Sequence, residues 1–164
     1  MTKGTEVPYF IISLKLIEKS KIEAMLEEFI KDTSLFLVAV KVSTSGKIIV
    51  LADTMKGITI DECALLHRHI ENNLDRNLED YELQVSSPGL DMPFMVTDQY
   101  YKNEGGKVEV TDNDGEKYTG KLKNVTAGGF ELETEVKVKG KTREIKDVSF
   151  NFDQVKSTKV FFKI

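Results

Sequence analysis

Residues 81–94 read Tyr-Glu-Leu-Gln-Val-Ser-Ser-Pro-Gly-Leu-Asp-Met-Pro-Phe. The first six alternate apolar and polar side chains, and this period of two predicts a half-buried β-strand over 81–86. Pro88 has no N–H for a strand ladder, so the strand should stop at Ser87. Gly89 is then expected to take the positive φ of a type II turn. The segment predicts the end of one domain and the start of a rigid linker.

This segment carries a family resemblance. The pattern Tyr-x-Leu-x-Val-Ser-Ser-Pro-Gly-Leu-Asp-x-Pro is similar to the signature of the bacterial ribosome maturation factor P (RimP) family. The similarity extends upstream through residues 57–63 and downstream to Gly105, Gly106 and residues 118–122, and it covers about residues 18–164.

From the residues alone, the Ser-Ser-Pro-Gly run is either a well-formed turn or a surface on which another molecule docks. The resemblance favours the docking surface. The interdomain and partner-binding residues are then Ser86, Ser87, Pro88, Gly89, Leu90, Asp91 and Pro93. Two positions depart from the family pattern, because Gln84 replaces the usual glutamate and Met92 the usual arginine.

The amino-acid composition limits which class of protein this can be. The 164 residues are 30% charged, and the mean hydropathy of −0.26 is typical of a globular chain. Its single cysteine, Cys63, rules out an internal disulfide framework and suits a reducing compartment. Lys15 interrupts the apolar N-terminal run and no small-residue cleavage site follows, so we expect neither a secretory signal nor a membrane span. The expected location is the cytoplasm.

The charge is unevenly distributed. Residues 1–98 hold 10 Lys and Arg against 16 Asp and Glu, a net charge of −6, whereas residues 99–164 hold 13 against 11, a net charge of +2. An acidic protein is a poor non-specific nucleic-acid binder, because that affinity comes mainly from neutralising phosphates. Any RNA contact is therefore expected in the second half.

Residues 18–90 predict an N-terminal α-β-β-α-β domain, with residues 1–17 as an extension before it. A capping-box pattern, Ser20 with Glu23, opens the first helix, and Thr59 with Glu62 opens the second. The expected elements are a helix from 20 to about 32, strands over 35–42 and 47–53, a helix over 59–74, and the strand at 81–86. We expect a two-layer α+β sandwich with both helices on one face of the sheet.

Residues 91–98 are the predicted linker and residues 99–164 the C-terminal domain. Five short strands alternate with turns there, over 107–111, 116–125, 130–137, 143–150 and 158–164. This rhythm predicts a small five-stranded β-barrel, in which closure removes exposed edges. The family resemblance likewise implies an SH3-like, or Sm-like, barrel.

Residues with catalytic or metal chemistry are sparse. Cys63 and His67 are four apart and share a helix face, but His69 lies nearly opposite, and two ligands are fewer than a structural zinc site uses. The sequence has no Gly-x-Ser-x-Gly elbow and no Walker loop. We expect no enzyme, no metal and no cofactor.

One basic cluster stands out in the second half. Lys137, Lys139, Lys141 and Arg143 flank Gly140 in a predicted hairpin, with Lys121 and Lys123 on a neighbouring strand. The cluster is either a solubilising hairpin that protects a sheet edge or a surface that contacts rRNA phosphates.

The resemblance implies a non-enzymatic ribosome maturation factor. Such a protein binds the immature small (30S) ribosomal subunit, through a small-subunit ribosomal protein, 16S rRNA or both, and assists its late assembly. We expect a monomer that binds no membrane. The alternative is a general RNA-binding module of KH-plus-Sm type that is not tied to ribosomes. Against it, a KH domain needs a Gly-x-x-Gly clamp, and no such spacing joins the predicted helices.

Overall fold

The computed structural model describes residues 17–137, 139–140 and 142–162 of the chain. The expected extension over residues 1–17 lies outside this description except for Ile17. The chain divides into two compact units, Met1–Pro88 and Gly89–Ile164. Both helices and strands occur in the described residues, which contain three α-helices and two separate sheets, so the α+β class is confirmed.

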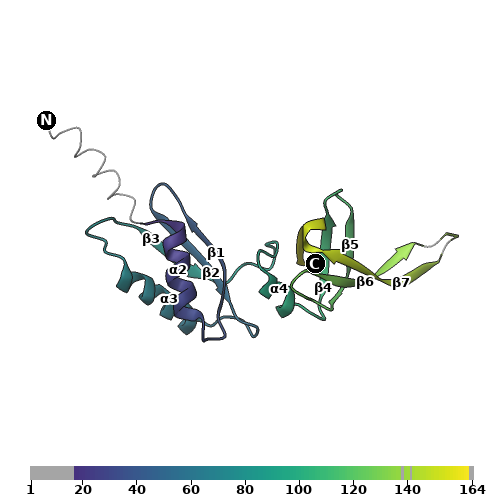
Figure 1. Ribbon diagram of the computed structural model, residues 1–164, viewed down its shortest axis with the longest axis horizontal. Coiled ribbons are helices and arrows are strands. Elements are labelled where there is room, and N and C mark those ends of the chain that lie inside the picture. The colour runs from purple at the N-terminus through teal and green to yellow at the C-terminus, as the bar shows by residue number, and fades with distance from the viewer. Residues whose placement is uncertain (1–16, 138, 141, 163–164) are drawn as a thin grey trace. The chain divides into compact units, whose positions relative to one another are not determined.

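The first unit contains two helices and a three-stranded sheet (Figure 1). In chain order these elements are α2 (Lys19–Ile30), β1 (Phe36–Val42), β2 (Lys47–Asp53), α3 (Ile60–Asn73) and β3 (Glu82–Ser86). The sheet order is β1-β2-β3; β1 pairs with β2 as an antiparallel hairpin, whereas β3 pairs with β2 in parallel.

Periodicity explains which faces of these elements are buried. Ile22, Leu26 and Ile30 follow one another at four-residue spacing and are all buried in α2. They share one apolar core with side chains of α3 and with the sheet residues Val40 and Val50. Both helices therefore cover the same face of the sheet (Figure 1).

The two predicted helix starts have different outcomes. At α3 the capping box is present: the Thr59 hydroxyl accepts the Glu62 N–H at 3.1 Å, and the Glu62 carboxylate accepts the Thr59 N–H at 2.9 Å. At α2 the predicted box is wrong, because the helix begins at Lys19 and its N-cap, Glu18, makes no side-chain cap. Ser20 lies inside the first turn and cannot cap it.

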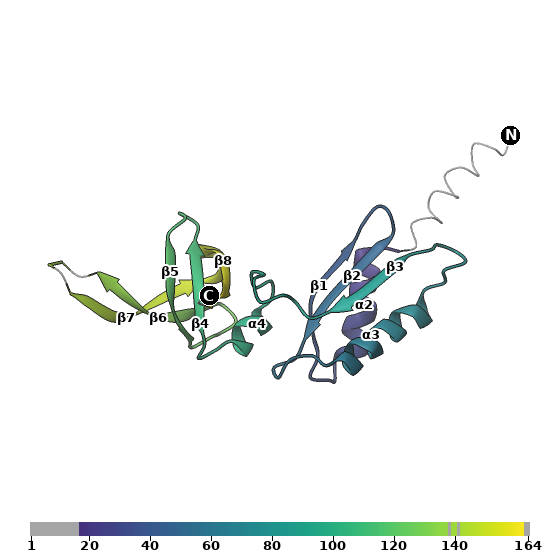
Figure 2. The same ribbon diagram turned by 180° about the vertical axis from the view of Figure 1, so that it is seen from behind.

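The second unit contains α4 (Thr97–Lys102) and five strands. These strands are β4 (Lys107–Asp112), β5 (Lys117–Lys123), β6 (Gly129–Lys137), β7 (Arg143–Asn151) and β8 (Val155–Val160). All neighbouring strands are antiparallel, in the order β7-β6-β5-β4-β8. Figure 2 shows β8 beside β4, and a 3-10 helix at Phe152–Gln154 links β7 to β8.

The predicted closed barrel is wrong for the described residues, because β7 and β8 form the two edges of an open sheet. The reason lies in the unequal lengths of the pairings. β5 pairs with β6 only over residues 131–134, whereas β6 pairs with β7 over 129–137. The β6–β7 hairpin therefore continues past the rest of the sheet, where β8 cannot meet it.

Candidate functional site

The Ser-Ser-Pro-Gly segment leaves the first sheet at β3. Ser86 is the last residue of that strand and lies opposite Leu51 of β2. The turn that follows spans Gly89–Met92, with the Met92 N–H donating to the Gly89 carbonyl at 3.1 Å. Leu90 and Asp91 occupy its two central positions, and the Leu90 side chain is 70% exposed.

The predicted type II turn with Gly89 at its third position is therefore wrong. Gly89 is the first residue of the turn, and its φ lies outside the positive range. Ser87 and Pro88 lie between β3 and this turn and belong to no helix or strand, which the fixed φ of proline allows equally well. A Cβ added at Gly89 would lie 2.8 Å from Oδ1 of Asp91, a flexible side chain, so a larger residue is not strongly excluded there.

The exit of this segment is fixed to the second sheet. The Phe94 N–H donates to the Thr158 carbonyl of β8 at 2.7 Å, and the Phe94 ring packs edge-on against Tyr100, with 4.9 Å between ring centroids. The Gln99 side chain accepts the backbone N–H groups of Met95 and Val96, and so caps the start of α4. Part of the predicted linker, residues 91–98, thus belongs to the packing of the second unit.

Tyr100 is the centre of this packing. Its hydroxyl donates to Thr158 Oγ1 at 2.8 Å, and its ring contacts Phe130 and Phe152. Burial raises the pKa of Tyr100, and the Thr158 hydroxyl offsets part of that rise because it can turn to donate to a phenolate. The segment after Pro93 is therefore tied to a rigid aromatic core.

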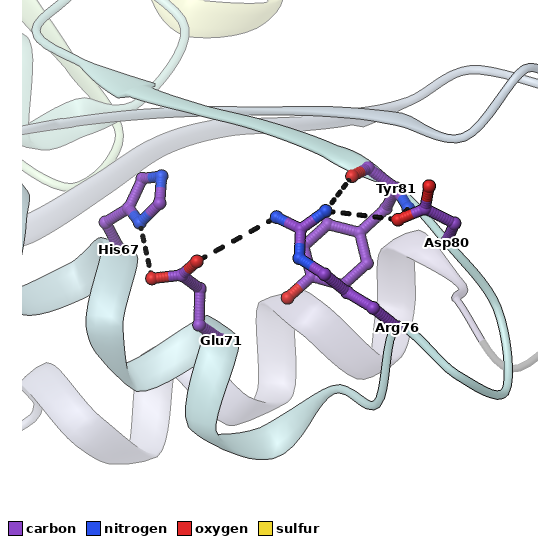
Figure 3. A network of polar contacts seen from close by, with 5 residues as sticks. All are labelled: His67, Glu71, Arg76, Asp80 and Tyr81. Atoms are coloured by element: carbon purple, nitrogen blue, oxygen red, sulfur yellow. Dashed lines mark hydrogen bonds and ion pairs between the residues drawn. The ribbon is translucent and has the colours of Figure 1, made fainter.

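A polar network in the first unit positions the start of β3 (Figure 3). Glu71 accepts from His67 Nδ1 at 3.1 Å and pairs with Arg76 at 3.8 Å. Arg76 also pairs with Asp80 at 3.1 Å, donates to the Tyr81 carbonyl, and lies over the Tyr81 ring at 4.0 Å from its centroid. The network joins the end of α3 to the strand that leads into the Ser-Ser-Pro-Gly segment.

The predicted pair of potential metal ligands has other contacts. His67 binds Glu71, and His69 stacks on Phe29 with 3.9 Å between ring centroids, so the two histidines point to different neighbours. Cys63 is a free, half-buried thiol, and burial raises its pKa, with Glu62 and Asp53 adding to the rise. In the part of the chain that the structure describes, no three His, Cys, Asp or Glu side chains cluster as a metal site.

The basic hairpin is only partly described, because Lys141 lies outside the described residues. Lys137 and Arg143 are direct cross-strand partners, and Lys139 and Gly140 form the turn between their strands. Arg143 pairs with Glu135 at 3.5 Å. Lys123 pairs with Asp147 at 2.8 Å and with Glu133 at 3.6 Å, and the Asp147 contact raises the pKa of Lys123.

Carboxylates thus alternate with the cations on this face of the sheet. The register brings Glu133 opposite both Lys121 and Asp147, and strand alternation puts Glu131 and Glu135 on the same side as Glu133. These acids could not be placed beside the cations from the sequence, because strand register is needed to show which charges share a face. The only signal for it was the alternating Glu131, Glu133 and Glu135 within β6.

A shallow groove of about 610 Å³ lies on the same region of the second unit. Its cationic lining residues are Lys107, Lys117, Lys121 and Arg143, and its anionic ones are Glu133 and Glu135. Two of the predicted cations, Lys121 and Arg143, are therefore brought together, while Lys123 is engaged by acids beside them. The groove offers a net positive, open surface that suits a large partner.

The described residues define an α+β protein of two compact units, each with its own sheet. A family model described as the RimP N-terminal domain matches residues 25–91, which include both strand pairings of the first unit. No helix in the described residues is long and apolar enough to cross a membrane.

Similar proteins extend the match into the second unit. A Ribosome maturation factor RimP of Porphyromonas gingivalis is 36% identical over 118 residues, which cover 72% of this chain and 78% of that protein. The one from Christiangramia forsetii is 34% identical over 79% of this chain and 81% of its own length. The one from Cytophaga hutchinsonii is 31% identical over 84% and 94%, respectively. The chain therefore belongs to the ribosome maturation factor RimP family. The relatives are named as maturation factors rather than enzymes, as the sequence predicted.

Proposed function

We propose that this protein binds the immature small (30S) ribosomal subunit and assists its late assembly by binding alone, without bond chemistry. Membership of the RimP family is the observation that carries the proposal, since relatives covering most of the chain are named ribosome maturation factors. Family membership also favours this function over a general KH-plus-Sm RNA-binding module. Subunit assembly is a cytoplasmic process, so we infer a cytoplasmic location.

The division of charge supports two different contacts on the subunit. Residues 1–98 carry a net charge of −6, which suits the basic segments of ribosomal proteins. The second unit offers the groove with Lys107, Lys117 and Lys121, which suits rRNA phosphates. The segment that joins the two units in sequence carries the proposed partner-binding residues, and five of them are exposed: Ser87, Gly89, Leu90, Asp91 and Pro93. Ser86 and Pro88 complete the proposed motif and are half-buried. Two weak contacts on one chain bind more tightly than either alone, because the first raises the effective concentration of the second.

Sedimentation of a cell lysate through a sucrose gradient tests the proposed function. The protein should migrate with free small subunits and not with polysomes. A protein that stays at the top of the gradient, or that follows all RNA equally, would contradict the proposal; the second result would favour the general RNA-binding alternative.

The proposed rRNA contact has its own test. Changing Lys137, Lys139, Lys141 and Arg143 to Ala should weaken binding to purified immature subunits and flatten its dependence on salt, because fewer counterions are released. Lys137→Ala with Lys139→Ala removes two of these cations, and Lys156→Ala with Lys159→Ala, on β8 at the other edge of the same sheet, is the matched control with the same change in charge. An affinity of the four-residue variant equal to that of the unchanged protein at every salt concentration would assign the hairpin cations to solubility.

A further inference from the structure

The strand β7 is an edge with unusual exposure. It pairs with β6 on one side and has no strand on the other in the described residues. All five residues from Arg143 to Asp147 are exposed, and the apolar side chain of Ile145, in their middle, is 68% exposed. An edge strand is a ready template for pairing with another chain unless charges or bulges oppose it.

The alternation of hydrogen bonds along β7 directs the backbone N–H and C=O groups of alternate residues to the free edge. The Phe152 N–H donates to the Gly128 carbonyl, and the β6–β7 register then continues without a bulge to Lys137 and Arg143. In an antiparallel ladder the bonded pairs alternate, so the even-numbered residues of β7 bond to β6. The N–H and C=O groups of Arg143, Ile145 and Asp147 consequently point to the free edge.

The charges along this edge are self-complementary in an antiparallel pairing. The sequence is Arg143-Glu144-Ile145-Lys146-Asp147, so its reverse exchanges every cation for an anion and keeps isoleucine at the centre. We propose that β7 pairs antiparallel with β7 of a second copy of this chain, about a two-fold axis at Ile145. Arg143 then faces Asp147 of the second copy, and Glu144 faces Lys146 of the second copy. A two-fold interface of this kind is self-complementary and closed.

Within each copy, the β6–β7 register sets like charges opposite one another, and the proposed pairing adds the opposite charge beside them. Lys137 lies directly opposite Arg143, and Glu133 lies directly opposite Asp147. Like charges directly opposite on a sheet are destabilising. Self-pairing places a carboxylate beside the cationic pair and a guanidinium beside the anionic pair, so the rows that contain these two like-charged pairs become balanced. The pairs Arg143–Glu135 and Lys123–Asp147 already hold these two groups on the outer face of the sheet.

The proposed pairing buries a small area, so the dimer should be weak. Five residues of one strand bury far less than the roughly 1,200 Å² of a stable interface. The protein should therefore be a monomer when dilute, in agreement with the monomer expected from the sequence, and a dimer when concentrated. Because charges fix the register, high salt should weaken the dimer.

Sedimentation equilibrium of the full chain from about 1 μM to about 1 mM tests this proposal, since 1 mM corresponds to the weakest association of interest. The mass should double as the concentration rises. Glu144→Lys and Lys146→Glu should each remain monomeric, because each sets like charges opposite one another. Their equimolar mixture should form dimers again, since one copy then presents two cations to two anions of the other. Neither residue belongs to the ion pairs described for this hairpin.

Two further variants keep the result decisive. Lys156→Glu makes the same charge change on β8 and should dimerise as the unchanged protein does. Ile145→Pro removes an N–H that points away from β6, so the unit should fold while the dimer is lost. A chain that is monomeric at 1 mM, single variants that dimerise normally, or a mixture that fails to dimerise would each overturn the proposal.

Discussion

The two sheets of this protein differ in their connections, and the connections decide what each sheet can offer a partner. In the first unit β3 joins β2 in parallel, which requires a long crossover, and α3 supplies it and covers the sheet. In the second unit every neighbouring pair is antiparallel, so no covering helix is required. The face that carries Lys121, Lys123 and Glu133 therefore stays in water and available for binding.

The covering helix should be the most sensitive part of the first unit. Leu66 is buried in α3, whereas the adjacent Leu65 is 46% exposed. Leu66→Ala should lower the free energy of unfolding by about 2–5 kcal/mol through lost burial and a residual cavity. Leu65→Ala, the matched control, should change it by less than about 1 kcal/mol. Urea unfolding measures both, and equal losses would show that α3 does not cover the sheet as described.

In the second unit the position least tolerant of a larger side chain should be Gly129, where β6 lies against β7. A Cβ at Gly129 would overlap the Phe150 carbonyl oxygen, whereas one at Gly128 would meet no heavy atom within 4 Å. Gly129→Ala should cost about 1–3 kcal/mol, because β6 and β7 must move apart. Gly128→Ala should cost little. If thermal melting shows the same Tm for both variants, the close packing of β6 on β7 is wrong.

The aromatic core of the second unit should respond to pH. The pKa of Tyr100 is raised by burial, so its contribution to stability is complete below the ordinary tyrosine pKa of about 10 and is lost as pH rises through the higher folded value. Tyr100→Phe should cost about 1 kcal/mol at neutral pH, through the lost Thr158 bond, and make the alkaline loss shallower. Tyr101→Phe, at an exposed neighbour, is the control. Urea unfolding across the alkaline range measures this, and an unchanged slope in Tyr100→Phe would contradict it.

The smallest effect should separate the two helix starts of the first unit. Thr59→Ala removes a side-chain cap and should cost about 1 kcal/mol. Ser20→Ala should cost nothing measurable, because Ser20 lies within α2 and caps no N–H group. Urea midpoints of the two variants provide the measurement, and a comparable loss in Ser20→Ala would restore the capping box that the sequence predicted.

Local sequence signals identified the elements well. Alternation predicted the strand that became β3, and the Thr59 box marked the start of α3. The same kind of signal failed at Ser20, because a capping-box spacing does not fix which residue begins the helix. It also failed at Gly89, where a Pro-Gly pair fits either the middle of a turn or the residues that lead into one.

Features that depend on contacts between distant residues could not be predicted from the sequence. The basic residues of the hairpin were visible, but the carboxylates among them became neighbours only through the β5–β6 and β6–β7 registers. The open sheet was missed for a related reason, since strand lengths alone do not reveal that β5 meets only part of β6. The place of Tyr100 at the aromatic core was missed as well, because it depends on the return of β8 to β4.

That return of β8 also sets an order of events during synthesis. The first unit has all its strands once Ser86 is made, so it can fold while later residues are still being added. β4 pairs with β5 soon after both are made, but its other edge must wait for a partner some fifty residues downstream, because Val108 pairs with Val160. At ribosomal speeds of about 5–20 residues per second, that interval lasts about 3–10 s. During that time each new chain has a complete first unit and an unpaired β4 edge. This is the period in which the chain is most exposed to strand pairing and aggregation with other chains.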